Sequence, residues 1–241
     1  MKFLEVNSLE VINSALSWET SECILTGRVE AYSCKSAGTD KKLFKTLEQR
    51  YNTLAPGSIS PDDIQVVSPF GRLTESTPRK TFFYLLATLN AAFPDNDFEN
   101  VRPDQFIKMP SVEMVMNSVN TTLFNLGNDV VVNQYRLWDV LDEIVQLNEC
   151  DVYTYNPDAD DDPMNDEDGY LWSVNYFFFN RKLKRMIFFS IKSESLNAPI
   201  GQEEGELRQV ERCLLIQVIY LFFFFFVNRA YDDEFMDNME V

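Results

Sequence analysis

Histidine is absent from this chain, and its absence excludes several common chemistries. Ser–His and Cys–His nucleophiles use an imidazole as general base, and many metal sites use imidazole ligands. Cysteine is scarce: the chain has Cys23, Cys34, Cys150 and Cys213, and no two of them have Cys-x-x-Cys spacing. The first residues lack the apolar run of a signal peptide. We therefore expect reduced thiols in the cytosol or nucleus, and the missing histidine excludes Ser–His and Cys–His catalysis and imidazole metal ligands.

Basic residues are also few in comparison with acidic residues. The 241 residues include 21 Lys and Arg against 38 Asp and Glu, which gives a formal net charge of -17. Concentrated Lys and Arg are needed to bind a phosphate backbone, so the chain as a whole should repel DNA and RNA. We expect protein partners with basic faces and no direct, specific nucleic-acid binding. An enzyme that works with carboxylates and lysines is compatible with this composition and is one alternative hypothesis.

Apolar residues at helical spacing predict helices over 8–17, 40–51, 77–93, 111–126 and 133–149. Asp40 is the expected N-cap of the second helix, and Thr77 is expected to cap the third, with Pro78 at its first position. In the last helix, one face should be formed by Leu137, Leu141, Ile144, Val145 and Asn148.

Residues of high β-propensity predict strands over 22–35, 150–157, 171–182 and 185–193. The last two strands are joined by a short basic turn and are expected to form a hairpin. In 171–182, Tyr176 and Phe178 point one way while Phe177 and Phe179 point the other, as expected of a central strand covered on both faces. The sequence predicts an α+β fold over residues 1–195, with one antiparallel β-sheet sandwiched by about four helices.

Residues 52–76 carry three prolines and no sustained periodicity, which is typical of a flexible insert. Ser60 and Ser68 stand directly before Pro61 and Pro69 in this insert, as proline-directed kinases require. A phosphate on either serine would add roughly -1.5 to -2 charges. The alternative is that both are ordinary turn serines.

Two charged segments adjoin the predicted hairpin strands: an acidic run before the first strand and a basic turn between the two. The acidic run at 158–169 lacks the glycine and the final glutamate of an EF-hand loop, so we interpret it as a solvated loop. The turn "NRKLKR" gathers Arg181, Lys182, Lys184 and Arg185. It is either a charged turn that prevents edge aggregation, or a nuclear-import signal or contact for an acidic partner.

Four stretches together resemble the Maf repressor family, the eukaryotic global negative regulators of RNA polymerase III transcription. They are "GRVEAYSCKSAGTDKKLFK" (27–45), "RKTFFYLLATLNAAFPDNDF" (79–98), "CDVYTYNPDADDDP" (150–163) and "LWSVNYFFFNRKLKRMIFFS" (171–190). The match runs in order over roughly residues 1–195. Asn96 departs from the family, which is expected to have an aromatic residue there.

The resemblance implies a non-enzymatic repressor with an antiparallel sheet between helices, and we expect no catalytic residue, no cofactor and no metal site. Its implied partners are RNA polymerase III, the TFIIIB initiation factor through a Brf-type subunit, and regulatory kinases and phosphatases. Phosphorylation of the insert, here at Ser60 and Ser68, would keep the protein inactive as it shuttles between nucleus and cytoplasm. The resemblance also favours a nuclear-import or binding role for the basic turn.

An apolar run, Cys213 to Val227, interrupts the acidic tail at 196–241. A helix of this length spans about 22 Å, whereas the bilayer core needs about 30 Å. A membrane-tethered adaptor and a packed core element are two hypotheses. The leading hypothesis is a translated intron, because a pyrimidine tract before a splice acceptor encodes phenylalanines such as Phe222–Phe226.

Overall fold

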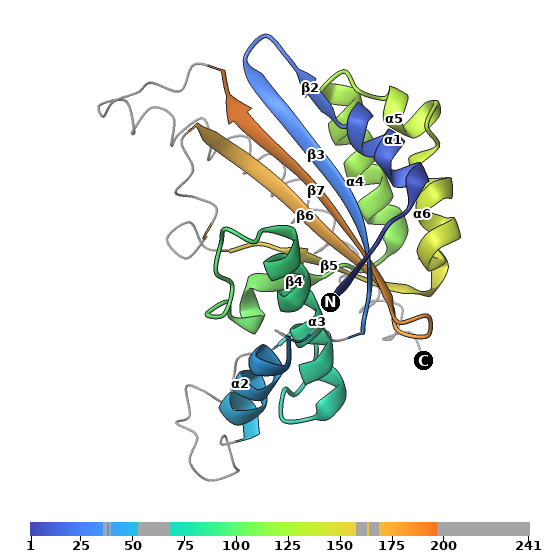
Figure 1. The fold of residues 1–241 in the computed structure, drawn as a ribbon. Helices are drawn as coiled ribbons and strands as arrows, with labels where there is room; N and C mark the ends of the chain where they lie inside the picture. Colours follow the sequence, from blue (N-terminus) through green and yellow to red (C-terminus); the bar gives the residue numbers. More distant parts are fainter. Residues whose placement is uncertain (36–37, 39, 53–67, 158–162, 164–168, 197–241) are drawn as a thin grey trace, which may run out of the picture.

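A computed structural model of the chain describes residues 1–35, 38, 40–52, 68–157, 163 and 169–196 (Figure 1). One antiparallel sheet runs through this part of the chain, with strand order β1-β3-β7-β6-β5-β4, and β2 also pairs with β3. The strands are β1 (Lys2–Leu4), β2 (Ser17–Glu19), β3 (Cys23–Ser33), β4 (Phe106–Lys108), β5 (Cys150–Tyr155), β6 (Tyr170–Asn180) and β7 (Arg185–Ser195). The predicted antiparallel sheet and the β6–β7 hairpin are confirmed.

Helices cover both faces of the sheet, as Figure 1 shows. They are α1 (Asn7–Ala15), α2 (Asp40–Asn52), α3 (Ser76–Ala92), α4 (Val112–Asn125), α5 (Val130–Asn133) and α6 (Leu137–Val145), with short 3₁₀ turns at Pro103–Gln105 and Leu147–Glu149. Residues of α2 and α3 share one hydrophobic core with one face of the sheet. Residues of α1, α4, α5 and α6 form a second core with the other face. The α+β sandwich predicted from the sequence is therefore correct.

The alternating aromatic residues of β6 explain why the sheet has two cores. Phe177 and Phe179 belong to the core under α2 and α3, while Tyr176 and Phe178 belong to the core under α1 and α4–α6. All four are at most 4% exposed. Successive side chains of a strand point to opposite faces, so a run of aromatic residues can only be buried if both faces are covered. The prediction of a central strand is confirmed.

The predicted helix over 133–149 is wrong as a continuous element. It is divided among α5, α6 and the 3₁₀ turn at Leu147–Glu149, because Arg136 (φ 52°) and Gln146 (φ 54°) have left-handed backbone conformations. The break after α6 rotates the chain, so Leu147 is buried while Asn148, predicted for the apolar face, is exposed. The other four residues of that face are buried as predicted.

The two predicted helix caps are also wrong. Asp40 is the first residue of α2, and its carboxylate accepts a hydrogen bond from the buried N-terminal ammonium of Met1. At α3 the N-cap is Glu75, which makes no side-chain cap, and Thr77 lies inside the helix.

The C-terminal part of the predicted insert belongs to the core. The ring of Phe70 packs against Phe82, Phe106 and Tyr153, with centroids 5.5, 5.9 and 5.2 Å away. This packing was not expected of a flexible insert, whose residues 53–67 lie outside the described part of the chain. Within the described part, no helix is both long and apolar enough to cross a membrane. The apolar run 213–227 also lies outside the described residues.

Gly27 lets β3 approach the end of α1 closely. Its N–H donates a 2.7 Å hydrogen bond to the carbonyl of Leu16, and a Cβ at Gly27 would lie 2.7 Å from the Cβ of Leu16. Real Cβ atoms do not approach so closely, so backbone or side chain must move.

We expect Gly27→Ala to lower the free energy of unfolding by about 1–3 kcal/mol, the usual cost of overpacking. Chemical denaturation measures the change. Gly38→Ala is the matched control, because a Cβ there has nothing within 4 Å, and it should change stability by less than about 0.5 kcal/mol. Equal stability of the two variants would show that α1 and β3 separate without cost.

Candidate functional site

The basic turn predicted from the sequence is the tight connection between β6 and β7. We call Arg181, Lys182, Lys184 and Arg185 the basic turn. Asn180 pairs with Arg185 as the last ladder position, and the Asn180 side-chain oxygen accepts the N–H of Leu183 at 2.9 Å. Lys184 adopts a left-handed conformation (φ 52°) that closes the turn. All four basic side chains are exposed.

Arg181 is fixed against the start of β5. Its Nε donates to Asp151 Oδ2 at 2.7 Å, a terminal nitrogen donates to the Tyr153 hydroxyl at 3.3 Å, and the guanidinium lies 5.5 Å from the centre of the Phe179 ring. The other oxygen of Asp151 accepts the ammonium of Lys108, from β4, at 2.8 Å. One carboxylate therefore joins the basic turn, β5 and β4.

The charges in this network change the titration of its members. Burial raises the pKa of Asp151, but hydrogen bonds from Lys108 and Arg181 outweigh it, and the net pKa is below the usual range. Burial and the charge of Asp151 raise the pKa of Tyr153 to about 12. The pKa of Arg181 is raised, because the bond to Asp151 outweighs burial. Asp151 is thus a carboxylate and Tyr153 a neutral phenol at neutral pH.

Other polar groups at this end of the hairpin cap the C-terminus of α6. Arg185 donates to the carbonyl of Ile144 at 2.9 Å, and the buried amide of Asn180 donates to the carbonyl of Val145 at 2.8 Å. The last carbonyls of a helix have no partner within the helix, so the hairpin supplies the donors that they need.

Two lysines of the basic turn differ in their environment. Lys182 forms an ion pair with Glu149. Lys184 contributes its backbone carbonyl to a 2.9 Å hydrogen bond from the N–H of Cys34, and its ammonium has no ion-pair partner within the described part of the chain. Arg181 and Lys182 pair with carboxylates and Arg185 donates to a backbone carbonyl, so within the described residues only the Lys184 side chain of the basic turn has no partner in the fold.

Of the two serines predicted as phosphorylation sites, only Ser68 lies within the described residues. Ser60 lies outside the described residues. Ser68 is half-buried in a turn, where its hydroxyl accepts the N–H of Phe70 at 3.3 Å and its carbonyl accepts the N–H of Gly71 at 3.0 Å.

The acidic run 158–169 lies mostly outside the described residues. One described residue of the run is Pro163, whose carbonyl accepts a 2.8 Å hydrogen bond from the side-chain amide of Asn96. Asn96 is the residue that departs from the pattern expected of the family. Among the described residues, no three His, Cys, Asp or Glu side chains group closely enough to hold a metal ion.

We expect Asp151→Asn to destabilise the protein by about 1 kcal/mol at pH 7, the scale of partly exposed ion pairs. Because the folded-state pKa of Asp151 lies below its unfolded value of about 3.9, its contribution is present above that pH. It is lost as the pH falls through the folded-state pKa. The stability gap between wild type and variant should therefore be constant near neutrality and close in acid, as measured by thermal unfolding at several pH values.

Asp95→Asn is the control, since Asp95 is exposed and has no ion-pair partner among the described residues. A wild-type advantage over Asp151→Asn that does not shrink as the pH is lowered into acid would contradict the ionic role of Asp151.

Comparisons with known proteins agree with the fold. Residues 25–190 match the family described as Maf1 regulator. The chain is 43% identical over 198 residues to the protein named repressor of RNA polymerase III transcription maf1 of Schizosaccharomyces pombe, covering 79% of this chain and 82% of the relative. It is 34% identical to the protein named repressor of RNA polymerase III transcription of Dictyostelium discoideum, over the full length of both chains.

Solved structures show the same architecture. Two crystal structures of citrus MAF1 are 34% identical to this chain in sequence and cover 78% and 79% of it, with TM-scores of 0.57 and 0.58, and each crystal chain is covered to 98%. The matched family spans most of the sheet and helices described above. The chain belongs to the Maf1 family.

Proposed function

We propose that this protein represses transcription by RNA polymerase III through direct binding to the polymerase. The carrying observation is that relatives named as repressors of this transcription match the chain at 43% and 34% identity, one of them over its full length. The shared fold with citrus MAF1 supports the same assignment.

The second part of the proposal concerns the mode of repression. The protein acts as a binding protein and not as an enzyme, and it contacts both the polymerase and the TFIIIB factor through its Brf-type subunit. The net charge of -17 supports protein surfaces over nucleic acid as the target. Such an acidic repressor is steered to basic surfaces that otherwise hold nucleic acid or an acidic factor.

The basic turn is proposed to contact a partner or to serve nuclear import. Arg181, Lys182 and Arg185 bind groups of the same chain, which supports a contact made by a folded turn. Lys184 is the side chain best placed to form that contact, because its ammonium has no ion pair within the described residues.

A reconstituted transcription assay tests the function. Purified unmodified protein should reduce transcription of a tRNA gene by purified RNA polymerase III and TFIIIB, and should leave RNA polymerase II transcription of a control template unchanged. We propose that it blocks recruitment of the polymerase, so it should act before initiation and not on elongating polymerase. Normal tRNA-gene transcription in the presence of saturating protein would overturn the proposal.

Phosphorylation is proposed to regulate this activity and to shift the protein between nucleus and cytoplasm. Ser60 and Ser68 are the candidate acceptors, each followed by proline. At Ser68 the hydroxyl lies two residues before Phe70, whose ring is part of the core. A phosphate on Ser68 would add negative charge at the point where the insert joins the folded domain, next to the hydrogen bond from Phe70 to Ser68.

We expect the double change Ser60→Ala and Ser68→Ala to keep the protein nuclear and repressive when growth signalling is high. Phosphopeptide mapping of the wild type should find both serines modified in growing cells and unmodified in starved cells. Measured tRNA synthesis in growing cells should be lower with the double variant than with the wild type. Ser58→Ala is a control, because Ser58 lies in the same segment without a following proline. Absence of phosphate at both serines during growth would remove this part of the proposal.

A further inference from the structure

Unpaired lysines gather at one end of this acidic molecule. We define the lysine surface as Lys35, Lys41, Lys42, Lys45 and Lys184, all of which are exposed. They come from three segments: the chain after β3, the start of α2, and the turn between β6 and β7. The whole chain has only 21 basic residues against 38 acidic ones, so this grouping is not expected from composition alone.

Specific contacts bring the three segments together. The N–H of Cys34 donates to the carbonyl of Lys184 at 2.9 Å, which places Lys35 beside the turn. The Met1 ammonium pairs with Asp40, the first residue of α2. Burial raises the pKa of the Cys34 thiol to about 12, while the Met1 ammonium and Lys184 oppose this rise. The antiparallel pairing of Lys2 with Ser33 also places Met1 opposite Cys34, so Asp40 and the start of α2 lie at the same end of β3 as Lys184.

Among the described residues, the lysines of this surface form no ion pair with a carboxylate. Elsewhere, basic side chains pair with acids, as in Arg136–Asp139 and Lys182–Glu149. Lys41 and Lys45 are one helical turn apart, a spacing at which like charges repel. The arrangement thus costs some stability and produces a local positive potential.

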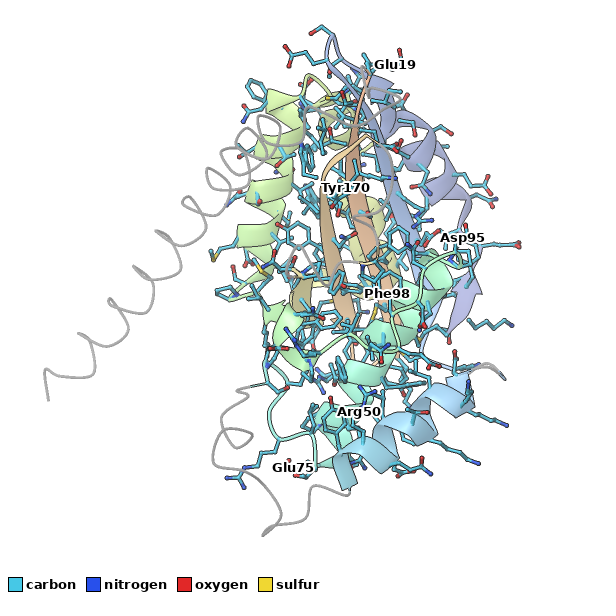
Figure 2. All side chains as sticks on the ribbon, turned by 90° about the vertical axis from the view of Figure 1, so that its left-hand side faces the viewer. Glu19, Arg50, Glu75, Asp95, Phe98 and Tyr170 are labelled. Atoms are coloured by element: carbon cyan, nitrogen blue, oxygen red, sulfur yellow. The ribbon has the colours of Figure 1, made fainter. Side chains whose placement is uncertain are left out.

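The packing of α2 leaves its lysines free to meet a partner. Leu43 and Leu47 are buried, and Phe44 stacks edge-on against Phe83 of α3 at 5.2 Å. The long side chains on the opposite face of α2 extend away from the body of the molecule (Figure 2).

Two apolar side chains come from the segments that flank the lysines. Phe3 is 52% exposed and stacks on Tyr32 of β3, while Leu183 is 40% exposed and precedes Lys184. Cations beside exposed apolar groups suit a protein segment that carries both carboxylates and apolar residues.

We propose that the lysine surface docks an acidic segment of the RNA polymerase III machinery, an inference that rests on the proposed function. A protein segment is favoured over nucleic acid, because the net charge of -17 repels a phosphate backbone at long range. Channels for single-stranded nucleic acid combine cations with several aromatic side chains on which successive bases stack, whereas Phe3 is the one exposed aromatic side chain beside these lysines among the described residues. The contact should be steered by charge and weakened by salt.

The test compares binding of full-length variants to purified, nuclease-treated RNA polymerase III at two salt concentrations. We expect Lys41→Glu, Lys42→Glu and Lys45→Glu together to weaken binding at least tenfold and to reduce its salt dependence. Acidic residues near the start of a helix are favoured by its dipole, so the variant should remain folded. The control carries Arg72→Glu, Lys80→Glu and Arg136→Glu, which change net charge equally at exposed, separate positions. Because Arg136→Glu also removes the ion pair with Asp139, thermal unfolding of both variants must show that they remain folded.

The outcomes are distinct. Failure of the wild type to bind polymerase would overturn the proposed function itself. Binding by the wild type that the α2 variant retains, or that the control loses equally, overturns the docking surface alone. Tighter binding by the α2 variant would mean that the surface instead holds an acidic segment of this chain. An effect seen only with polymerase that carries nucleic acid would assign the surface to nucleic acid and overturn the inference.

Discussion

The burial of aromatic side chains on both faces of the β6–β7 hairpin is the constraint on which the rest of the structure depends. Phe177 and Phe188 pack ring to ring at 5.0 Å in one core, and Phe178 and Phe189 lie in the other. These large apolar side chains must be removed from water on both faces of the hairpin. The sheet therefore needs a helical layer on each face, with β3 and β5 protecting the edges of the hairpin.

The end of the same hairpin organises the polar part of the molecule. Its side chains supply donors to the last carbonyls of α6 and hold Asp151 at the start of β5. A cluster of four basic residues in a turn therefore has a structural use, and this explains why three of them are already engaged. At this end of the molecule, the side chain that is available to a partner is that of Lys184, which forms no ion pair among the described residues.

Charge is distributed unevenly in a way that fits a recognition protein. Carboxylates are abundant, so most ion pairs can form without special arrangement, and each contributes little. A surface on which several lysines meet without ion pairs has to be built, here by a backbone hydrogen bond between Cys34 and Lys184 and by the Met1–Asp40 pair. The second of these also neutralises the one acidic side chain in the first turn of α2.

Much of the fold could be predicted from sequence, because the spacing of apolar residues along a helix or strand is a local property of the chain. The alternation in 171–180 determined a central strand, and the missing histidine restricted the chemistry. The ends of α6 could not be predicted, since Gln146 ends the helix where Asn180 and Arg185, 35 and 41 positions from the carbonyls they cap, supply donors. Strands β1, β2 and β4 have three residues each, too few to show a period. The turn was visible in the sequence, but its pairing with Asp151 and the lysine surface were decided only by tertiary structure, because both join segments that are distant along the chain.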